Sequence, residues 1–504
     1  MRSCDLSAIL IYPNSRDVAL ASLGFLKVHQ MLSERLEPVD MAYLPRNLDD
    51  VVLSPKQHLL VGERTRAEAR RFDVVAFSVA YENDFAHLPG LLRLAGMPAL
   101  AEARRDTFPL VICGGFTMSM NPLPIADFVD VVVVGEAEPL IEDLLAAIED
   151  AKRRNLPKPV LLRALSDLDG IYVPSLEARQ VRRAWSPVEM IAADPEAQAA
   201  SHFGNMLLVE IGRGCGRGCL FCAAGNLYRP VRMRKLETIL ENVAGARRIG
   251  LVGTAAADHP DLIAILERLA AQGRTVSLGS FRADALTSEI ADLVVECGAK
   301  TVTLAPEAGG DELRARIGKR ITRVQLTDAV ETLAEAGVHR VKLYFMIGLP
   351  GETDRDALAI VDLVRILARV RGRAQLSISV APLVPKPHTA FQWCGFIDRG
   401  TFSRRAAILR KILSIKGCSL KVASYQEAWL EAVLSKGDRS LAPALLEAAE
   451  AGLPLKTVLR RRGVPDIHAE LDTEKPLPWD FIESGVARKG LKEQYLRVAR
   501  AKEG

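Results

Sequence analysis

Hydrophobic runs alternate with helical patterns through the first 160 residues. Short runs rich in β-branched residues stand at 8–12, 73–79, 110–113 and 130–134. The segments 23–32 and 139–152 have the spacing of helices between them. A continuous apolar run is typical of a strand that is buried on both faces, as in a parallel sheet covered by helices. The pattern predicts a doubly wound α/β domain over residues 1–160, with a ligand crevice at the carboxyl ends of its strands.

A second strand–helix pattern begins at residue 206 and repeats six times. The predicted strands are 206–211, 249–252, 275–278, 301–305, 340–347 and 375–380. Six such units joined by right-handed crossovers predict an open (βα)6 arc, a partial TIM-type barrel, over residues 206–400. The irregular segment 161–205 is expected to be an interdomain linker, and residues 401–504 a mainly helical C-terminal region.

Composition narrows the class of protein. The chain has 504 residues, 49% of them hydrophobic, and a net charge of +4, which argues neither for nor against a polyanionic partner. We interpret the basic stretch Arg460–Arg462 as a solvated helical surface, so nucleic acid is not an expected partner. No apolar run reaches membrane-spanning length, and the start lacks a signal-peptide pattern, so we expect a cytoplasmic protein without membrane contact. Eight cysteines, three of them clustered, do not resemble a disulfide framework.

The clustered cysteines are the strongest chemical signal. Cys215, Cys219 and Cys222 fall within eight residues, directly after a predicted strand. Three thiolates at this spacing can hold three irons of a [4Fe–4S] cluster and leave the fourth iron without a protein ligand. Arg213 and Arg217 place positive charge nearby, which favours thiolate over thiol. The competing interpretations are a zinc site with a distant fourth ligand and, less favoured, three unrelated thiols.

The spacing CxxxCxΦC, with Phe221 at Φ, resembles the signature of the radical S-adenosylmethionine (SAM) superfamily. The resemblance implies that SAM binds the open iron. One electron from the reduced cluster then cleaves SAM reductively to a 5′-deoxyadenosyl radical, which abstracts hydrogen from a substrate. It also implies the same (βα)6 arc and an electron donor such as flavodoxin or ferredoxin. The cofactors would supply the chemistry, and the protein placement and electrostatics.

Loops after successive predicted strands supply candidate SAM contacts. Thr254, or a backbone carbonyl after Gly253, would accept from the SAM amino group, because the glutamate that the family often has in this turn is missing. Ser280 and Arg282 suit ribose and carboxylate, and Glu307 can bridge two ribose hydroxyls. The turn at Gly348 would present backbone groups to adenine. Each of these motifs is also an ordinary turn or helix cap, and only their joint placement indicates a site. The full expected set is Phe221, Gly253, Thr254, Ser280, Arg282, Glu307 and Gly348.

The stretch 114–139, GGFTMSMNPLPIADFVDVVVVGEAEP, resembles part of the cobalamin-binding-like front domain of a large radical SAM subgroup. The implied cobalamin contacts are Ser78, Gly114, Gly115, Asn121, Gly135 and Glu136. Many such domains place a histidine from a DxHxxG loop on the cobalt, but residues 14–24 contain none. His29, His58 and His87 are alternative ligands, although each also reads as a surface or helix residue. Without a histidine in residues 14–24, either cobalamin binds with no protein histidine below the metal, or the domain has kept only the shape.

Three further blocks, TVTLAPEAGGDELRARIGKRIT, VKLYFMIGLPGET and LVPKPHTAFQWC, are similar to the same subgroup, and the resemblance spans about residues 1–440. The candidates for substrate or interdomain contact follow the sixth strand: Lys386, His388, Gln392 and Trp393. The alternative is a loop that packs its aromatic side chain into the front domain. We expect a radical SAM enzyme, with cobalamin-dependent methyl transfer as the first hypothesis. The alternatives are hydrogen abstraction for rearrangement or cleavage without cobalamin, and a non-enzymatic iron–sulfur or cobalamin sensor. The substrate is not predicted.

Overall fold

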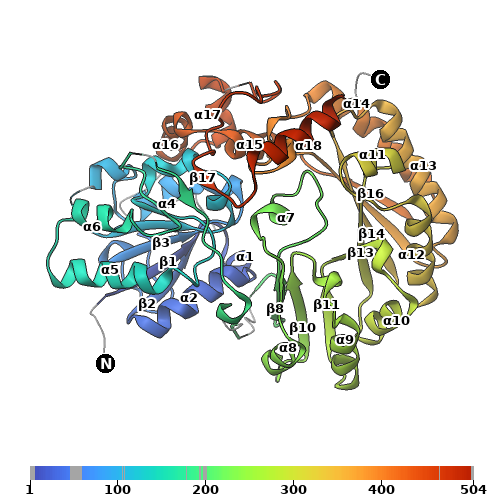
Figure 1. The fold of residues 1–504 in the computed structure, drawn as a ribbon, viewed down its shortest axis with the longest axis horizontal. Coiled ribbons are helices and arrows are strands. Elements are labelled where there is room, and N and C mark those ends of the chain that lie inside the picture. Colours follow the sequence, from blue (N-terminus) through green and yellow to red (C-terminus); the bar gives the residue numbers. More distant parts are fainter. Residues whose placement is uncertain are drawn as a thin grey trace. The chain divides into compact units, whose positions relative to one another are not determined.

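A computed structural model describes residues 6–45, 59–104, 106, 108–177, 179–191, 195–196, 201–243, 245–464 and 466–500. The chain forms two compact units (Figure 1). Unit 1 consists of Met1–Asn205, Val433–Asp466 and Glu474–Gly485; unit 2 consists of Met206–Ala432, Ile467–Thr473 and Val486–Gly504. Within the described ranges, none of the helices is both long enough and apolar enough to span a bilayer.

Unit 1 contains a six-stranded sheet in the order β2-β1-β3-β4-β5-β6. Its strands are β1 (Ala8–Tyr12), β2 (Val39–Tyr43), β3 (Val74–Ser78), β4 (Leu110–Gly114), β5 (Val131–Val133) and β6 (Ile171–Tyr172). The first five are parallel and β6 is antiparallel to β5, which confirms the predicted doubly wound domain. Strand β2 was not predicted, because Asp40 interrupts its apolar run. The order places the topological switch point between β1 and β3.

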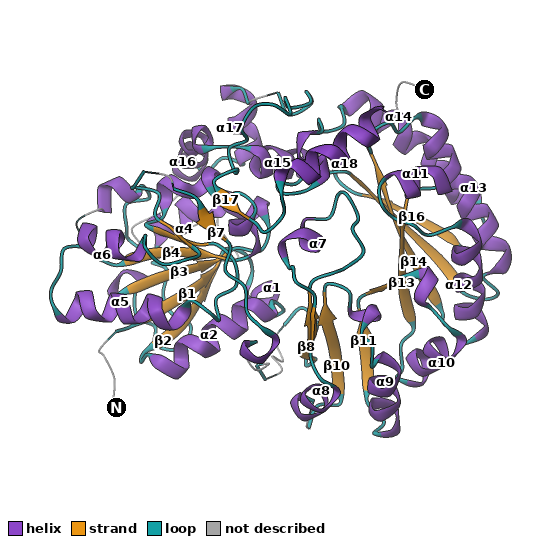
Figure 2. Cartoon of the chain, viewed as in Figure 1, coloured by secondary structure: helices purple, strands orange, loops and turns teal. Residues whose placement is uncertain are grey.

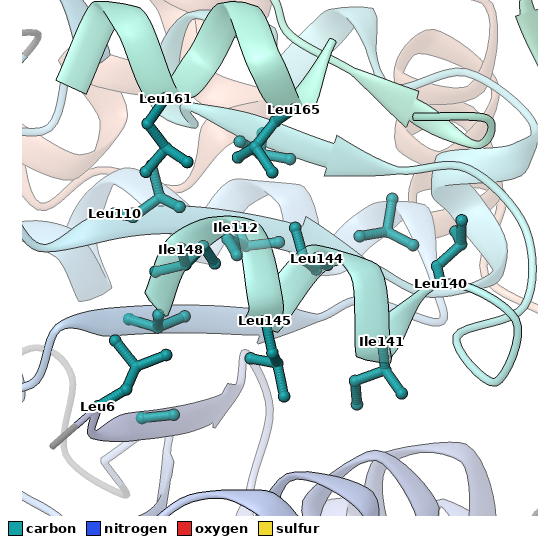
Figure 3. Packing of buried hydrophobic residues seen from close by; sticks show 14 of the residues in the cluster. Leu6, Leu110, Ile112, Leu140, Ile141, Leu144, Leu145, Ile148, Leu161 and Leu165 are labelled. Atoms are coloured by element: carbon teal, nitrogen blue, oxygen red, sulfur yellow. The ribbon is translucent and has the colours of Figure 1, made fainter. Parts of the chain in front are cut away.

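Helices cover both faces of this sheet (Figure 2). They are α1 (Arg16–Ala19), α2 (Leu23–Arg35), α4 (Leu88–Leu94), α5 (Ile141–Arg153) and α6 (Lys158–Leu165). Figure 3 shows Leu144 and Ile148 of α5 and Leu165 of α6 in one apolar cluster with Leu110 and Ile112 of β4. Burial of these aliphatic side chains stabilises the layers against each other by about 1.5–3 kcal/mol for each side chain.

Residues near the C-terminus complete unit 1. Helices α16 (Ala442–Ala451) and α17 (Leu455–Arg462) belong to it, and β17 (Ile482–Glu483) pairs in parallel with β7 (Val181–Arg182). The Asn121 side chain donates to the carbonyl oxygens of Ser435 and Gly437, at 3.1 and 2.6 Å. The helical C-terminal region is thus present as predicted, and part of it packs with residues from the first 205.

Unit 2 is an arc of parallel strands. They are β8 (Leu207–Arg213), β10 (Arg248–Gly253), β11 (Thr275–Leu278), β12 (Ser280–Phe281), β13 (Thr301–Glu307), β14 (Arg340–Ile347), β15 (Gln375–Pro382) and β16 (Cys418–Val422). The strands form two sheets, β11-β10-β8-β9 and β12-β13-β14-β15-β16, where β9 (Arg232–Met233) is antiparallel to β8. The partial barrel is confirmed, with a break between β11 and β12. Strand β16 lies within the C-terminal region that was predicted to be mainly helical. It is an edge strand whose half-exposed alternation gives a weak signal.

The helices of unit 2 connect these strands, and α9, α10, α12 and α13 line the outer side of the arc in Figure 1. The α-helices of unit 2 are α7 (Ala223–Leu227), α8 (Leu236–Asn242), α9 (Leu262–Ala271), α10 (Ser288–Glu296), α11 (Asp311–Arg316), α12 (Arg323–Glu335), α13 (Asp354–Val370), α14 (Arg399–Leu409), α15 (Tyr425–Lys436) and α18 (Arg488–Arg500). Thr322 and Thr353 start α12 and α13 with capping boxes, which satisfy amide groups at the helix ends. Helix α15 continues past Ala432 into unit 1.

Candidate functional site

The cysteine loop, residues 214–222, leaves the carboxyl end of β8. Its three cysteines are unpaired thiols of intermediate exposure. Cys222 is the N-cap of α7, and its Sγ accepts a hydrogen bond from the backbone amide of Gly225 at 3.3 Å. The carboxyl end of a strand in such an arc is where the loops that carry chemistry collect.

Burial controls the protonation of the thiols. Desolvation raises the pKa of Cys219 and Cys222, and the Lys319 ammonium opposes this at Cys219. Cys215 also raises the pKa of both, so all three sulfurs lie within electrostatic range of one another. Among the described residues, no three His, Cys, Asp or Glu side chains converge as the ligands of a single metal ion. Three neighbouring thiols in one loop suit three irons of a multi-iron cluster.

The segment Ile317–Lys319, after α11, closes against the cysteine loop. The backbone amide of Leu220 donates to the carbonyl oxygen of Ile317 at 3.0 Å. Gly318 has φ +79°, and a Cβ there would lie 2.7 Å from the carbonyl oxygen of Gly218. Glycine is therefore required at this position for both its conformation and its small size.

Glu307, the last residue of β13, lies beside this contact. Its Oε1 is 3.4 Å from Lys319 Nζ, and both side chains are largely buried. Burial raises the pKa of Glu307, and the Lys319 charge acts in the opposite direction. Glu307 has φ +69°, a strained conformation for a residue other than glycine, and such strain clusters at functional sites.

Two more loops meet the cysteine loop. Thr254, after β10, accepts from the backbone amide of Gly214 through its Oγ1 at 3.3 Å. Arg217 in the loop binds both carboxylate oxygens of Asp258, at 2.9 and 2.6 Å. Arg282 binds Asp284 in the same two-point manner, at 2.9 and 2.8 Å, and the charge of Arg217 helps to lower the pKa of Asp284. The structure thus places Thr254 against the cysteine loop and Glu307 within electrostatic range of Cys219 and Cys222, while Arg282 pairs with Asp284. Contact of these three residues with SAM stays a prediction.

The other SAM candidates have weaker structural links. Gly253 packs beside the carbonyl oxygen of Gly212, Phe221 is half-buried in the cysteine loop, and Ser280 is exposed on β12. Gly348 starts a turn that is stabilised by its own residues, because the buried Glu352 carboxylate accepts hydrogen bonds from the backbone amides of Gly348 and Leu349. For these four residues, as for the other three, contact with SAM stays a prediction.

The candidates after β15 lie in a folded turn. Lys386 Nζ is 2.6 Å from Glu431 Oε1, and the backbone amide of His388 donates to Gln392 Oε1 at 3.0 Å. Trp393 is fully buried, with its ring centroid 5.7 Å from that of Tyr495 on α18, within unit 2. These contacts give Gln392 and Trp393 an internal role, and substrate contact by the four residues stays a prediction.

The cobalamin candidates of unit 1 also contact their own chain. Gly115 and Gly135 have φ near +115°, and a Cβ on either would lie within 2.3 Å of a carbonyl oxygen, that of Val79 or Ala184. Glu136 accepts from the backbone amide of Ser186 at 2.9 Å, and the Asn121 amide is held as described above. For four of the six residues, these contacts within the chain explain the residue's conformation or position, and no bound ligand is needed to explain it. Ser78 and Gly114 end β3 and β4, and cobalamin binding by the set stays a prediction.

Two of the three histidines that were considered as alternative cobalt ligands lie in the described residues. Burial lowers the pKa of His29 on α2 and of His87. His87 Nδ1 lies 2.8 Å from the carbonyl oxygen of Pro13, which occupies that nitrogen. His58 lies outside the described residues.

Sequence reasoning missed Lys319 and Asn226 at the site. Lys319 stands in an ordinary basic stretch, and its return to Glu307 depends on the turn at Gly318. Asn226 is four residues after Cys222, about one helical turn, and this spacing was the only local pattern that could have linked it to the cysteine.

Comparisons with known proteins agree with this architecture. Residues 24–174 match the family described as "Radical SAM proteins, N-terminal", and residues 209–364 match the "Radical SAM superfamily". An uncharacterized protein of Methanocaldococcus jannaschii is 27% identical over 86% of this chain and 90% of its own length. An uncharacterized methyltransferase of Pyrococcus horikoshii is 26% identical over 51% of this chain and 58% of its own length. A tRNA-2-methylthio-N(6)-dimethylallyladenosine synthase of Anaplasma marginale is 25% identical over 48% of this chain and 51% of its own.

Two solved structures share the fold. The radical S-adenosylmethionine methyltransferase TsrM of Kitasatospora setae, solved with tryptophan and a SAM analogue, has a TM-score of 0.55 at 13% identity, over 90% of this chain and 99% of its own. The cobalamin-dependent S-adenosylmethionine radical enzyme OxsB, solved with aqua-cobalamin, has a TM-score of 0.52 at 16% identity, over 71% of this chain and 52% of its own.

Proposed function

The chain belongs to the radical SAM superfamily and is an enzyme of that superfamily, and from this premise we propose that it cleaves SAM reductively at a [4Fe–4S] cluster held by Cys215, Cys219 and Cys222. When bound and reduced, the cluster supplies the single electron that breaks a C–S bond of SAM, which gives methionine and a 5′-deoxyadenosyl radical. The electron comes from an external donor of the flavodoxin or ferredoxin class, and the radical abstracts hydrogen from a substrate.

The observation that carries the proposal is the contact of the Ile317–Lys319 segment with the cysteine loop. The Glu307–Lys319 pair lies near Cys219, and Thr254 accepts a hydrogen bond from Gly214 at the start of the loop. The Lys319 ammonium favours the thiolate form of Cys219, which a metal requires. Glu307 and Thr254 then offer acceptors for the hydroxyl and ammonium groups of SAM.

The first candidate for the overall reaction is cobalamin-dependent methyl transfer. Its support is the fold shared with OxsB and TsrM, together with the Pyrococcus methyltransferase among the relatives. The second candidate is hydrogen abstraction without cobalamin. The contacts of Gly115, Gly135 and Asn121 favour it, because they fill three of the expected cobalamin positions with the protein's own groups.

Cluster binding is tested by anaerobic reconstitution with iron and sulfide. The parent is expected to turn brown and, with reductant and SAM, to release 5′-deoxyadenosine. Cys219→Ala is expected to lose both signals while it stays folded by circular dichroism. Cys418→Ala is the matched control, because Cys418 is a half-exposed thiol on β16 and should change neither. A variant with all three loop cysteines replaced that kept iron and turnover would refute the assignment. A cluster without release of 5′-deoxyadenosine would favour a sensor.

The two candidate reactions are separated by corrinoid content. Anaerobic reconstitution with hydroxocobalamin, followed by desalting, should leave about one cobalt per chain if the first candidate holds. A protein that retains its iron and cleaves SAM but retains no cobalt chromophore would support the second candidate and exclude the first.

A further inference from the structure

A side-chain hydrogen bond joins the helix that follows the third cysteine to the loop after β15. Asn226 lies on α7, which begins directly after Cys222, and its side-chain amide donates to the carbonyl oxygen of His388 at 2.9 Å. The two residues are 162 positions apart, and both are buried. A buried bond between such distant segments fixes their relative position.

The acceptor of this bond is itself held in place. His388 has φ +57°, a left-handed conformation that is strained for a residue other than glycine. Its amide is bound by Gln392 Oε1, and Thr389 Oγ1 donates to the carbonyl oxygen of Lys386 at 2.7 Å. Lys386 is tied to Glu431. Strained conformations persist where the surroundings over-determine them. The turn therefore holds the His388 carbonyl at a set position.

Helix α7 needs such an anchor. It has five residues, far below the length at which a helix is stable by itself. The bond from the Gly225 amide to Cys222 Sγ exists only while this turn of helix is formed. An anchor at Asn226 therefore acts on the position and hydrogen bonding of the Cys222 sulfur.

We propose that Asn226 is a positioning residue, which holds Cys222 in place for cluster assembly by anchoring α7 to the His388 carbonyl. The proposal rests on the proposed function, in which Cys222 is a cluster ligand. It assigns the His388 segment a supporting role through its backbone, distinct from contact with a substrate.

The test uses the full-length protein without iron, under anaerobic conditions. Each cysteine's rate of alkylation by iodoacetamide is measured by peptide mass spectrometry, and the rate of Cys222 is divided by that of Cys215 in the same sample. Asn226→Ala and Asn226→Asp both remove the donor, and each is expected to raise this ratio about fivefold, the effect of losing one buried hydrogen bond. His388→Gly keeps the carbonyl and suits the left-handed conformation, so its ratio should stay within about twofold of the parent.

Three outcomes would overturn the proposal: an unchanged ratio in both Asn226 variants, an equal rise at all three loop cysteines, or a rise in His388→Gly as large as in Asn226→Ala. The second readout is iron retention after reconstitution, where Asn226→Ala should lose iron to a chelator about fivefold faster than the parent. If the parent assembles no cluster, the proposed function fails while the alkylation result still stands, so the two failures are distinguishable.

Discussion

Lys319 and Glu307 form an ion pair beside the cysteine loop, with 3.4 Å between Nζ and Oε1. The pair joins the end of β13 to the segment that closes on Leu220. It places one positive and one negative group near Cys219. Replacement of either partner would leave a largely buried charge without its counterpart, and such a change is costly.

The first prediction concerns SAM affinity. Glu307→Ala is expected to raise the SAM dissociation constant roughly tenfold, because about 1.4 kcal/mol of hydrogen bonding is lost. Glu307→Gln keeps an acceptor and should lose less. Anaerobic equilibrium dialysis of reconstituted protein measures both, and unchanged affinity in the alanine variant would remove Glu307 from the site.

The second prediction concerns Gly318. Gly318→Ala should destabilise the protein by about 1–2 kcal/mol from its left-handed φ alone, with further cost from the clash with the Gly218 carbonyl. Gly310→Ala is the control in the same connection, since its Cβ would meet no atom within 4 Å and its φ is negative. Thermal unfolding of both variants, with iron content after reconstitution, checks this. Equal melting temperatures would contradict the described packing.

Two adjacent arginines give the third prediction. Arg405 binds the buried Glu352 carboxylate at 2.5 Å, whereas Arg404 binds Asp354 at 2.7 Å on the surface. Arg405→Met should cost about 3–5 kcal/mol, because it leaves Glu352 buried without its partner. Arg404→Met should cost about 0–1 kcal/mol. Urea unfolding measures the difference, and similar values for the two variants would show that the inner pair is not formed.

The fourth prediction concerns the pH dependence of unit 1. Burial raises the pKa of Asp84 to about 6, although Asn14 donates to its carboxylate at 2.9 Å. The folded pKa exceeds the unfolded value of about 3.9, so the folded state loses stability as pH rises from about 4 to 6. Asp84→Asn removes this titration.

The difference in unfolding free energy between Asp84→Asn and the parent should therefore shift in favour of the variant by about 2–3 kcal/mol as pH rises from 4 to 7.5. Denaturant titrations of both proteins at several pH values test it. A constant difference between variant and parent across this range would exclude an elevated pKa.

The pattern of apolar positions predicted most of the strands that position the site. The strand before the cysteines was expected at 206–211, and the structure has Leu207–Arg213. Buried strands in parallel sheets carry long apolar runs, so their signal is local. Strand β16 was not predicted, because it alternates exposed and half-buried residues at a sheet edge. The sequence pattern also did not show that C-terminal segments belong to unit 1, because their contacts are with residues far away in the sequence.

The residues of the candidate site also differ in whether a local sequence pattern points to them. The motif spacing pointed to the cysteines and to Glu307, because those residues lie at or directly after the carboxyl ends of strong strands. The partners of these residues could not be found in this way. Lys319 reaches Glu307 across a turn, and Asn226 reaches His388 across 162 residues, so each pairing exists only once the strands are assembled.

The order in which the chain visits its two units limits how the protein can be divided. After Ala432 it passes to unit 1, returns for Ile467–Thr473, crosses again for Glu474–Gly485, and ends in unit 2. A fragment that stopped at residue 432 would lack β17, the partner of β7 in one unit, and α18, whose Tyr495 covers Trp393 in the other. No single cleavage of the chain therefore yields two complete units.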